Sequence, residues 1–227
     1  VDVVVTGTPK SGTSDSVLTP LDQWAAESDV VLAVNANYFS RVNRKGDELP
    51  MSDIIGLSVS NGVVVSGARS FNGRADPALV FRADQTADIG YLDEASAPME
   101  AVAGVGASPS DAVPGTLLVA DGTNLGTSAR VDPLVRHPRT AANVSADGRT
   151  LWLVAIDGRQ PDWSVGMTLP ELAGLMIELG ADDAINLDGG GSTSFWYRPD
   201  GKSPPLVNRP SDGAFRPVAN HLGVSVR

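Results

Sequence analysis

Three consecutive glycines at positions 189–191 follow the carboxylate of Asp188 and precede the hydroxyl groups of Ser192 and Thr193. Because glycine has no side chain, backbone N–H groups in such a stretch can approach a ligand closely and form a concavity that accepts an anion. No lysine follows the glycines and the G-x-G-x-x-G spacing is absent, so the stretch predicts neither a P-loop nor a dinucleotide site. A plain flexible turn is the competing interpretation of the glycines alone.

A second carboxylate, Asp157, also lies beside a glycine after an apolar run, as Asp188 does. Such a residue can serve as nucleophile, general base or metal ligand, but an aspartate next to glycine is also an ordinary turn residue. Cysteine is absent, which excludes thiolate chemistry and disulfides, and two histidines are too few for a His-rich zinc site. We interpret His137 and His221 as structural or supporting residues.

Arginines suited to phosphate recognition lie near the second carboxylate. The pair Asp147-Gly148 predicts a hairpin between residues 140–145 and 150–156, in which partner numbers sum to 295 and Arg139 lies opposite Ile156. Arg139 and Arg159 should therefore emerge at the same end of a sheet, with Arg136 nearby. Planar guanidinium groups bind phosphate with two hydrogen bonds, although solvated surface arginines are an equally good interpretation.

The composition is that of a folded globular protein with an acidic surface. Of the 227 residues, 42% are hydrophobic and 19% charged, which is enough apolar surface for one domain over 1–227. The net charge of −10 repels nucleic acid and anionic membranes, so a phosphate ligand would need a local basic pocket. No apolar run approaches the roughly 20 residues of a membrane-spanning helix.

The periodicity predicts an α+β fold built mostly from antiparallel, twisted sheets with a few packed helices. A helix over residues 168–180 carries a capping box, and a shorter helix is expected to begin with Thr19 as its N-cap and Pro20 at its first helical position. An Asn61-Gly62 hairpin joins 54–60 to 63–65. Other strands are expected over residues 1–6, 30–34, 78–81, 100–105, 116–119 and 184–187. The site is expected where strands 30–34, 140–145, 151–156 and 184–187 end, with residues 199–215, including Asn208 and Arg209, as a loop over it.

In chain order, five elements resemble the phosphodiester glycosidase family: HPRTA at 137–141, DGR at 157–159, the helix at 168–180, AINLDGGGS at 184–192 and RPVAN at 216–220. The resemblance is strongest from Val135 to the C-terminus. Before it, the stretch NANYF at 35–39 resembles the family's Asn-Gly-Gly-Phe-Phe element, with Ala36 and Asn37 in place of the glycines. The ordered series is more specific than any one of its motifs.

This resemblance implies hydrolysis of a glycosyl-1-phosphodiester at the anomeric C–O bond, which gives a free sugar and a phosphomonoester. It implies Asp188 and Asp157 as the catalytic carboxylates, in roles that the sequence does not distinguish. A bound Ca²⁺ or Mg²⁺ could share the task, although the sequence does not require one. The implied substrate-binding residues are Asn35, Arg139, Thr140, Arg159, Asn186, Gly189, Gly190, Gly191, Ser192, Thr193, Arg216 and Asn220.

The expected protein is a secreted or cell-envelope hydrolase that acts on a small or polymeric sugar phosphodiester, such as an exopolysaccharide or other envelope glycan. One alternative is a phosphodiesterase that breaks the P–O bond instead. Another is a non-catalytic glycan-binding module of a larger envelope protein. The presence of both candidate carboxylates favours an enzyme over the binding module.

Overall fold

The computed structural model describes residues 2–9, 14–41, 50–71, 73–107 and 113–226 of the chain. Within them, strands predominate, and the two α-helices are short elements: α1 (Leu21–Glu27) and α2 (Leu169–Glu178). Every strand pairing that these residues form is antiparallel. The predicted α+β class therefore holds in a strongly β-rich form.

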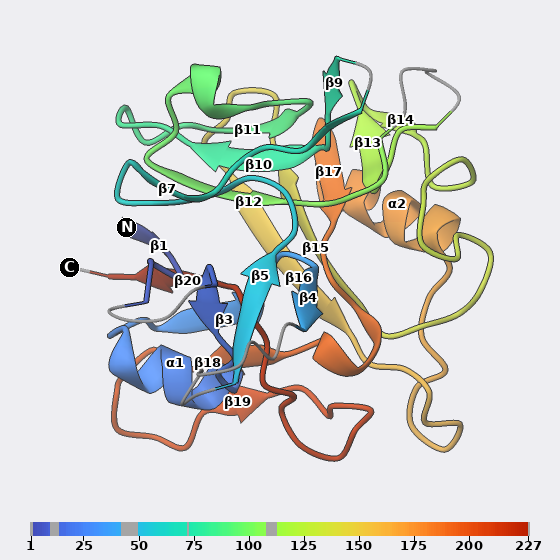
Figure 1. Ribbon diagram of the computed structural model, residues 1–227. Helices are drawn as coiled ribbons and strands as arrows, with labels where there is room; N and C mark the ends of the chain where they lie inside the picture. The colour runs from blue at the N-terminus through green and yellow to red at the C-terminus, as the bar shows by residue number, and fades with distance from the viewer. Residues whose placement is uncertain (1, 10–13, 42–49, 72, 108–112, 227) are drawn as a thin grey trace.

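The first sheet contains both ends of the described chain (Figure 1). Its edge strand β1 pairs with β20, and β3 lies at the centre, so segments about 200 residues apart in sequence form neighbouring strands. The strand order is β1 (Asp2–Val5), β20 (His221–Ser225), β3 (Leu32–Asn35), β18 (Phe195–Tyr197) and β19 (Leu206–Val207).

The second sheet lies at the top of Figure 1 and comes entirely from the first half of the chain. The predicted Asn61-Gly62 hairpin is confirmed: both residues have positive φ, at 50° and 74°, as a tight two-residue turn requires. The strand order is β11 (Ala87–Gly90), β10 (Ala78–Phe81), β12 (Glu100–Ala103), β6 (Ser58–Ser60) and β7 (Val63–Ser66).

The third sheet contains the hairpin that the Asp147-Gly148 pair predicts. Its register is confirmed, since Arg139 pairs with Ile156 and Val144 with Leu151. β15 also pairs with β17, so it separates β16 from β17, and the crossover through α2 joins strands that are not neighbours. The strand order is β14 (Thr123–Asn124), β13 (Leu117–Ala120), β17 (Asp183–Asn186), β15 (Arg139–Val144) and β16 (Leu151–Ile156).

Shorter elements complete the described fold. One small sheet has the order β2 (Ser16–Val17), β5 (Met51–Ile54), β4 (Phe39–Arg41), and another pairs β8 (Ser70–Phe71) with β9 (Arg74–Ala75). Two 3-10 turns are η1 (Glu94–Ser96) and η2 (Gly190–Ser192). No helix among the described residues is long and apolar enough to cross a membrane.

The two helices differ in how well their starts were predicted. The capping box of α2 is confirmed: the Thr168 hydroxyl accepts from the Glu171 N–H, and the Glu171 carboxylate accepts from the Thr168 N–H. For α1 the predicted cap is wrong by one residue. Pro20 is the N-cap, and the Thr19 hydroxyl donates to the Val17 carbonyl instead, because the Thr19 backbone pairs with Val218.

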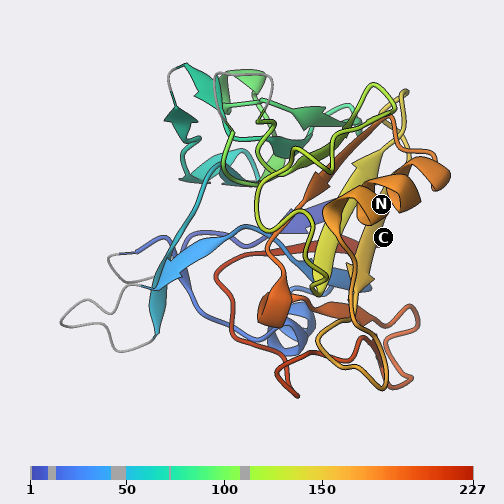
Figure 2. The ribbon, with the colours of Figure 1, turned by 90° about the vertical axis from the view of Figure 1, so that its right-hand side faces the viewer.

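One apolar core joins the three large sheets. Val34, Leu79, Val102, Leu117 and Ile185, from five strands of the three sheets, lie in the same buried cluster. A second cluster forms where Leu169, Leu172, Ala173 and Met176 pack α2 against the outer face of the third sheet (Figure 2). With both faces covered, β15 is buried over its whole length, which fixes the residues at its start next to the ends of β3 and β17.

Candidate functional site

Asp188 lies two residues after the end of β17 and is held there by two other segments. Its N–H donates to the Ala36 carbonyl after β3, at 3.0 Å, and the preceding Leu187 N–H donates to the Thr140 carbonyl, at 2.9 Å. The ends of β3 and β17 and the start of β15 thus meet at Asp188, at the sheet end where the sequence predicted the site. Burial raises the pKa of Asp188 to about 6, although hydrogen bonds from the Ser192 hydroxyl and the Gly189 N–H oppose this rise.

The Asp188 carboxylate opens into a cavity of about 470 Å³. Tyr38, Phe39, Ser192 and Arg216 complete its lining. This volume lies within the range of small-molecule sites in proteins. The cavity therefore combines one ionisable carboxylate with one guanidinium, beside the triple-glycine bend.

The glycines make room for two arginine side chains. A Cβ atom at Gly190 would lie 3.1 Å from Nη1 and Nη2 of Arg159, and a Cβ atom at Gly191 would lie 1.9 Å from Nη2 of Arg216. Gly190 also has a φ of +61°, which side chains rarely adopt. Two guanidinium groups therefore pack directly against consecutive glycines, two and three residues after Asp188.

Both arginines are held by neighbours. Nε and Nη2 of Arg216 donate to the same carboxylate oxygen of Asp212, at 2.9 and 2.6 Å. Arg159 has a left-handed backbone (φ 59°), and its Nε donates to Nδ1 of His137 at 3.4 Å. Burial, together with the cations Arg139 and Arg159, keeps the pKa of His137 below its usual range, so a neutral imidazole supports Arg159.

Part of the predicted backbone cradle is already occupied. The Gly189 N–H donates to Oδ1 of Asp188, and the Gly190 N–H donates to the Pro138 carbonyl, both at 2.9 Å. A Cβ atom at Gly189 would lie 2.9 Å from that same carbonyl oxygen. The bend thus offers an anion mainly the two guanidinium groups, and its glycines are needed for close packing.

Asn35 positions the carboxylate without facing the cavity. Its Oδ1 accepts from the Thr140 hydroxyl at 2.6 Å and from the Ser194 N–H at 3.0 Å, while its Nδ2 donates to the Asp188 carbonyl at 2.6 Å. Asn35 and Thr140 are both buried. Their predicted contact with substrate stays a prediction; in this structure they join β3, β15 and the chain around Asp188.

Asn186, Asn220 and Thr193 are likewise fully buried. Nδ2 of Asn186 donates to the Tyr38 phenol oxygen at 2.9 Å, and Nδ2 of Asn220 donates to Oδ1 of Asn37 at 3.0 Å. Their predicted contact with substrate stays a prediction; in this structure the two asparagines bond to Tyr38 and Asn37. Ser192 is equally buried, but it lines the cavity through its hydrogen bond to Asp188.

Arg139 is buried among backbone carbonyls, and its predicted contact with phosphate stays a prediction. Its side chain is only 2% exposed, and its guanidinium donates to four carbonyls, those of Met167, Val131, Asp132 and Val135, at 2.9 to 3.2 Å. The hairpin does bring it near Arg159, but the guanidinium turns toward the loop at 131–135 and not toward the glycine bend. We therefore assign Arg139 to holding that loop.

Asp157 accepts hydrogen bonds from three other residues. Its carboxylate accepts from Nε1 of Trp163 at 2.8 Å, from Nδ2 of Asn208 at 2.9 Å and from the Arg209 N–H at 3.1 Å. Asp157 is not among the residues lining the Asp188 cavity. It ties residues 160–166 and the predicted loop at 199–215 to the end of β16, and its predicted catalytic role stays a prediction.

Tyr38 is a cavity residue that sequence reasoning did not single out. It follows β3 by three positions, between Asn37 and Phe39, and its phenol oxygen accepts from Asn186. Burial and the nearby Asp188 carboxylate raise the pKa of Tyr38 well above its usual range, so the phenol keeps its proton. Its position within the NANYF stretch was the one available signal.

The remaining predicted groups lie outside the cavity. Arg136 pairs with Glu171 at the start of α2. His221 is stacked on Trp24 with ring centroids 4.9 Å apart, and its Nε2 donates to the Thr19 carbonyl, which supports a structural role. Over the described ranges, no group of three or more acidic, histidine or cysteine side chains could hold a metal ion. The Ca²⁺ or Mg²⁺ expectation stays a prediction.

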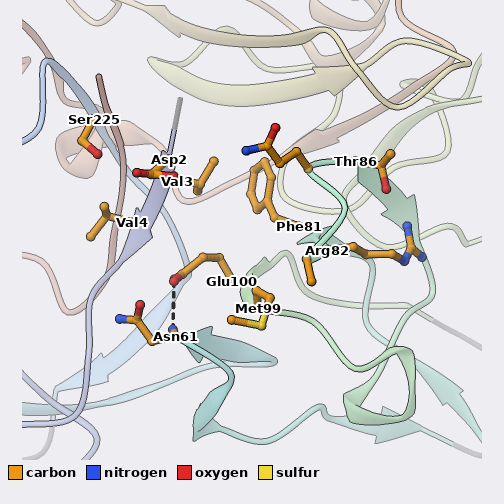
Figure 3. A pocket seen from close by; sticks show the side chains of 12 residues that line it. Asp2, Val3, Val4, Asn61, Phe81, Arg82, Thr86, Met99, Glu100 and Ser225 are labelled. Carbon is orange, nitrogen blue, oxygen red and sulfur yellow. Dashed lines mark hydrogen bonds between the residues drawn. The ribbon is translucent and has the colours of Figure 1, made fainter. Parts of the chain in front are cut away.

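Another cavity, of about 460 Å³, lies beside β1 and β12 (Figure 3). Its most unusual group is Glu100, whose carboxylate accepts from the Val5 and Asn61 N–H groups at 3.0 and 2.8 Å. Burial raises the pKa of Glu100 to about 7. This cavity contains none of the predicted site residues, and Glu100 joins the edge strand of the first sheet to the second sheet.

The sequence profile of the phosphodiester glycosidases matches residues 28–225. This chain belongs to the phosphodiester glycosidase family. A relative from the SPbeta prophage of Bacillus subtilis strain 168, the uncharacterized protein YomE, is 31% identical over 175 residues, or 76% of this chain. The same alignment covers 26% of YomE, so the chain spans about a quarter of that relative's length.

Solved structures share the fold of this family member. The catalytic domain of zebrafish N-acetylglucosamine-1-phosphodiester alpha-N-acetylglucosaminidase, auto-inhibited by its pro-peptide, has a TM-score of 0.68 at 21% identity, covering 99% of this chain and 73% of that one. A candidate exported protein from Burkholderia pseudomallei K96243 has a TM-score of 0.60 at 18% identity, covering 99% and 71%. A hypothetical protein from Synechocystis has 0.61 at 18%, covering 99% and 57%.

Proposed function

We propose that this phosphodiester glycosidase hydrolyses a glycosyl-1-phosphodiester at the bond between the anomeric carbon and the phosphate oxygen. The observation that carries the proposal is the shared cavity of Asp188 and Arg216, with Arg159 packed against the adjoining glycine. A carboxylate suits the sugar side of such a bond, and guanidinium groups suit its phosphate side. The family membership supports the same reaction class.

The two ends of the cavity would act on opposite charges in the transition state. As the C–O bond breaks, its electron pair leaves with the phosphate oxygen, and positive charge develops on the anomeric carbon and ring oxygen. Arg216 and Arg159 would stabilise the leaving phosphate, while ionised Asp188 would stabilise the sugar cation. Water adds to the anomeric carbon and loses its proton to the Asp188 carboxylate, which yields the free sugar and a phosphomonoester.

The same arrangement favours C–O over P–O cleavage. A phosphodiester is already an anion, so attack by an anionic carboxylate at phosphorus would bring like charges together. At the anomeric carbon the carboxylate instead meets developing positive charge. A phosphate leaving group is also a stabilised anion, so the reaction needs less help from a general acid than alkoxide departure does.

We further propose that the substrate lies outside the cytoplasm, in a glycan or an envelope polymer. The structural likeness to a candidate exported protein of Burkholderia pseudomallei is in line with this location. Secretion can be tested by expressing the gene's full product in its native host and measuring its distribution between culture medium, envelope and cytoplasm. A product confined to the cytoplasm would contradict this part of the proposal.

The reaction is tested with methyl phosphodiesters of N-acetylglucosamine, glucose, galactose and mannose, each linked through the anomeric oxygen. The native protein should release free sugar and methyl phosphate from at least one of them, as followed by phosphorus and proton NMR. Asp188→Asn should abolish the release, because the amide carries no negative charge. Gly174→Ala is the matched control and should keep full activity, because a Cβ atom added at this helix position would lie within 4 Å of nothing outside the neighbouring helix backbone. Turnover unaffected by Asp188→Asn would overturn the assignment.

A further inference from the structure

A further cavity, of about 450 Å³, shares Tyr38 with the Asp188 cavity. Its lining includes the guanidinium-bearing residues Arg69 and Arg130 together with Gly106 and Val131. Tyr38 thus lies between a cavity with a carboxylate and a guanidinium and a neighbour whose charged lining, among the described residues, consists of two arginines. The chain as a whole is acidic, and Arg69 is paired with the Asp76 carboxylate, so among the described residues Arg130 supplies the unpaired positive charge of this lining.

Arg130 is fixed by the backbone around it. A Cβ atom at Gly106 would lie 2.9 Å from Cγ of Arg130, and Gly106 has a φ of +80°, so the arginine stem occupies space that only glycine leaves open. The Arg130 N–H donates to the Gly115 carbonyl at 2.6 Å. Among the described residues, no carboxylate forms an ion pair with the Arg130 guanidinium. Within these ranges its charge is not neutralised by an ion pair.

Arg69 is oriented by a buried carboxylate. Its Nε and Nη2 donate to one oxygen of Asp76, at 3.0 and 2.8 Å, while the other oxygen of Asp76 accepts from the Ala107 N–H at 2.9 Å. The side chain of Asp76 is only 8% exposed. Asp76 therefore connects the two walls of the cavity, since Ala107 follows Gly106, and it leaves Nη1 of Arg69 unconstrained by this ion pair. A guanidinium fixed in this way is preorganised for an anion.

The loop that carries Val131 is held in a strained conformation. Val131 and Asp132 have φ values of 71° and 52°, and a positive φ is costly for a β-branched residue such as valine. The buried guanidinium of Arg139 donates to both of their carbonyls. The strained pair follows Arg130 directly, so Arg139 fixes the wall of this neighbouring cavity.

We infer that this cavity is a second anion subsite, which binds the phosphate of the next repeat in a chain of sugar phosphodiesters. This inference rests on the proposed function, and it assigns a polymeric rather than a single-linkage substrate. The cleaved linkage lies between Asp188 and Arg216, the chain passes Tyr38, and the neighbouring phosphate lies between Arg69 and Arg130. Guanidinium pairs favour phosphate because of their planar, two-pronged geometry.

The subsite is tested first with inorganic phosphate, which requires no knowledge of the sugar. Amide signals of the native protein are followed by two-dimensional NMR as phosphate is added. Signals of Gly106 and Val131 should shift as one set, and those of Gly191 and Ser192 as another. Arg130→Gln should remove the first set and keep the second. The absence of any phosphate-dependent shift at Gly106 and Val131 would overturn the subsite.

The second arm separates free phosphate from a substrate phosphate. Asp188→Asn protein is titrated with a one-repeat and a two-repeat methyl ester of the sugar phosphate that the native enzyme cleaves best, or of N-acetylglucosamine 1-phosphate if it cleaves none. The two-repeat ester should bind about tenfold tighter, and Arg130→Gln should remove most of that preference. Arg149→Gln, an exposed arginine on a distant hairpin, is the matched control and should keep it.

The outcomes distinguish the two proposals. Equal affinity for both esters would overturn the polymer inference, even if inorganic phosphate still binds near Arg130. If the native enzyme cleaves the one-repeat ester and Arg130→Gln leaves the preference for the two-repeat ester unchanged, the proposed function is kept and the subsite is rejected. If the two-repeat ester binds more tightly but the native enzyme cleaves neither ester, the subsite is kept and the proposed function is rejected. A two-repeat ester with an uncharged second linkage should bind no tighter than one repeat.

Discussion

The guanidinium of Arg216 lies where a side chain at residue 191 would begin, since a Cβ atom on Gly191 would be 1.9 Å from Nη2 of Arg216. The third glycine of the bend is therefore needed because a side chain there would occupy the space of the Arg216 guanidinium, and not because the chain must be flexible. The same relationship, at 3.1 Å, links Gly190 to Arg159. The glycine run brings two positive charges to the chain that carries Asp188.

We predict that Gly191→Ala strongly reduces activity with little effect on stability. The new methyl group displaces the end of a flexible side chain, so the fold should lose no more than about 1 kcal/mol. A guanidinium moved by about 1 Å should lower kcat/KM by roughly 100-fold. Steady-state kinetics and thermal melts check both values, with Gly174→Ala as control. Full activity in Gly191→Ala would show that the position of Arg216 does not matter.

The pH dependence of activity should report Asp188. Burial raises its pKa to about 6, and the proposed reaction uses the ionised form, so kcat/KM should be constant above pH 7 and fall as the pH drops through about 6. The measurement is a pH profile of kcat/KM in constant ionic strength. A profile that instead falls as the pH rises above 6 would mean that the protonated acid is the active form.

Asp157→Asn separates the structural from the catalytic interpretation of that residue. Its carboxylate accepts from Trp163, Asn208 and Arg209, and an amide would turn one donor group toward these donors. We expect a stability loss of about 1–3 kcal/mol and faster proteolysis within residues 199–215. We also expect kcat to fall by no more than about tenfold, against roughly 1,000-fold or more for Asp188→Asn. Equal losses of kcat would restore Asp157 as a catalytic residue.

Arg139→Lys should destabilise the fold although the charge is kept. Four carbonyls accept from the planar guanidinium, and a lysine ammonium group cannot reach all of them. Each hydrogen bond that is lost contributes about 0.5–1.5 kcal/mol, so the midpoint of denaturant unfolding should fall clearly. Arg149→Lys, at an exposed position, is the control. An unchanged midpoint for Arg139→Lys would contradict the assigned role.

Local sequence signals predicted the framework of the site well. The hairpin register and the capping box of α2 follow from contacts between residues close in sequence, and the apolar run before Asn35 indicated β3. The period of two in β17 placed Ile185 and Leu187 in the core and left Asp188 at the strand's end facing the cavity. These are the features that turn chemistry and periodicity determine.

The directions of long side chains could not be predicted in the same way. Arg139 and Arg159 emerge at one sheet end, but the direction of the Arg139 side chain depends on carbonyls of the loop at 131–135. No local pattern in the sequence indicates the strained backbone of that loop. The role of Asp157 likewise depends on Asn208, a partner 51 residues away. The hydrogen bond from Asn35 to the Asp188 carbonyl joins residues 153 positions apart, which no local signal indicates.

Hydrolysis in ¹⁸O-labelled water tests the central claim most directly. The native enzyme is incubated with the methyl sugar phosphodiester that it cleaves best, and both products are analysed by mass spectrometry. Cleavage at the anomeric carbon, with Asp188 stabilising the sugar cation, predicts that the label enters the free sugar and that methyl phosphate stays unlabelled. Label in methyl phosphate, with an unlabelled sugar, would contradict it.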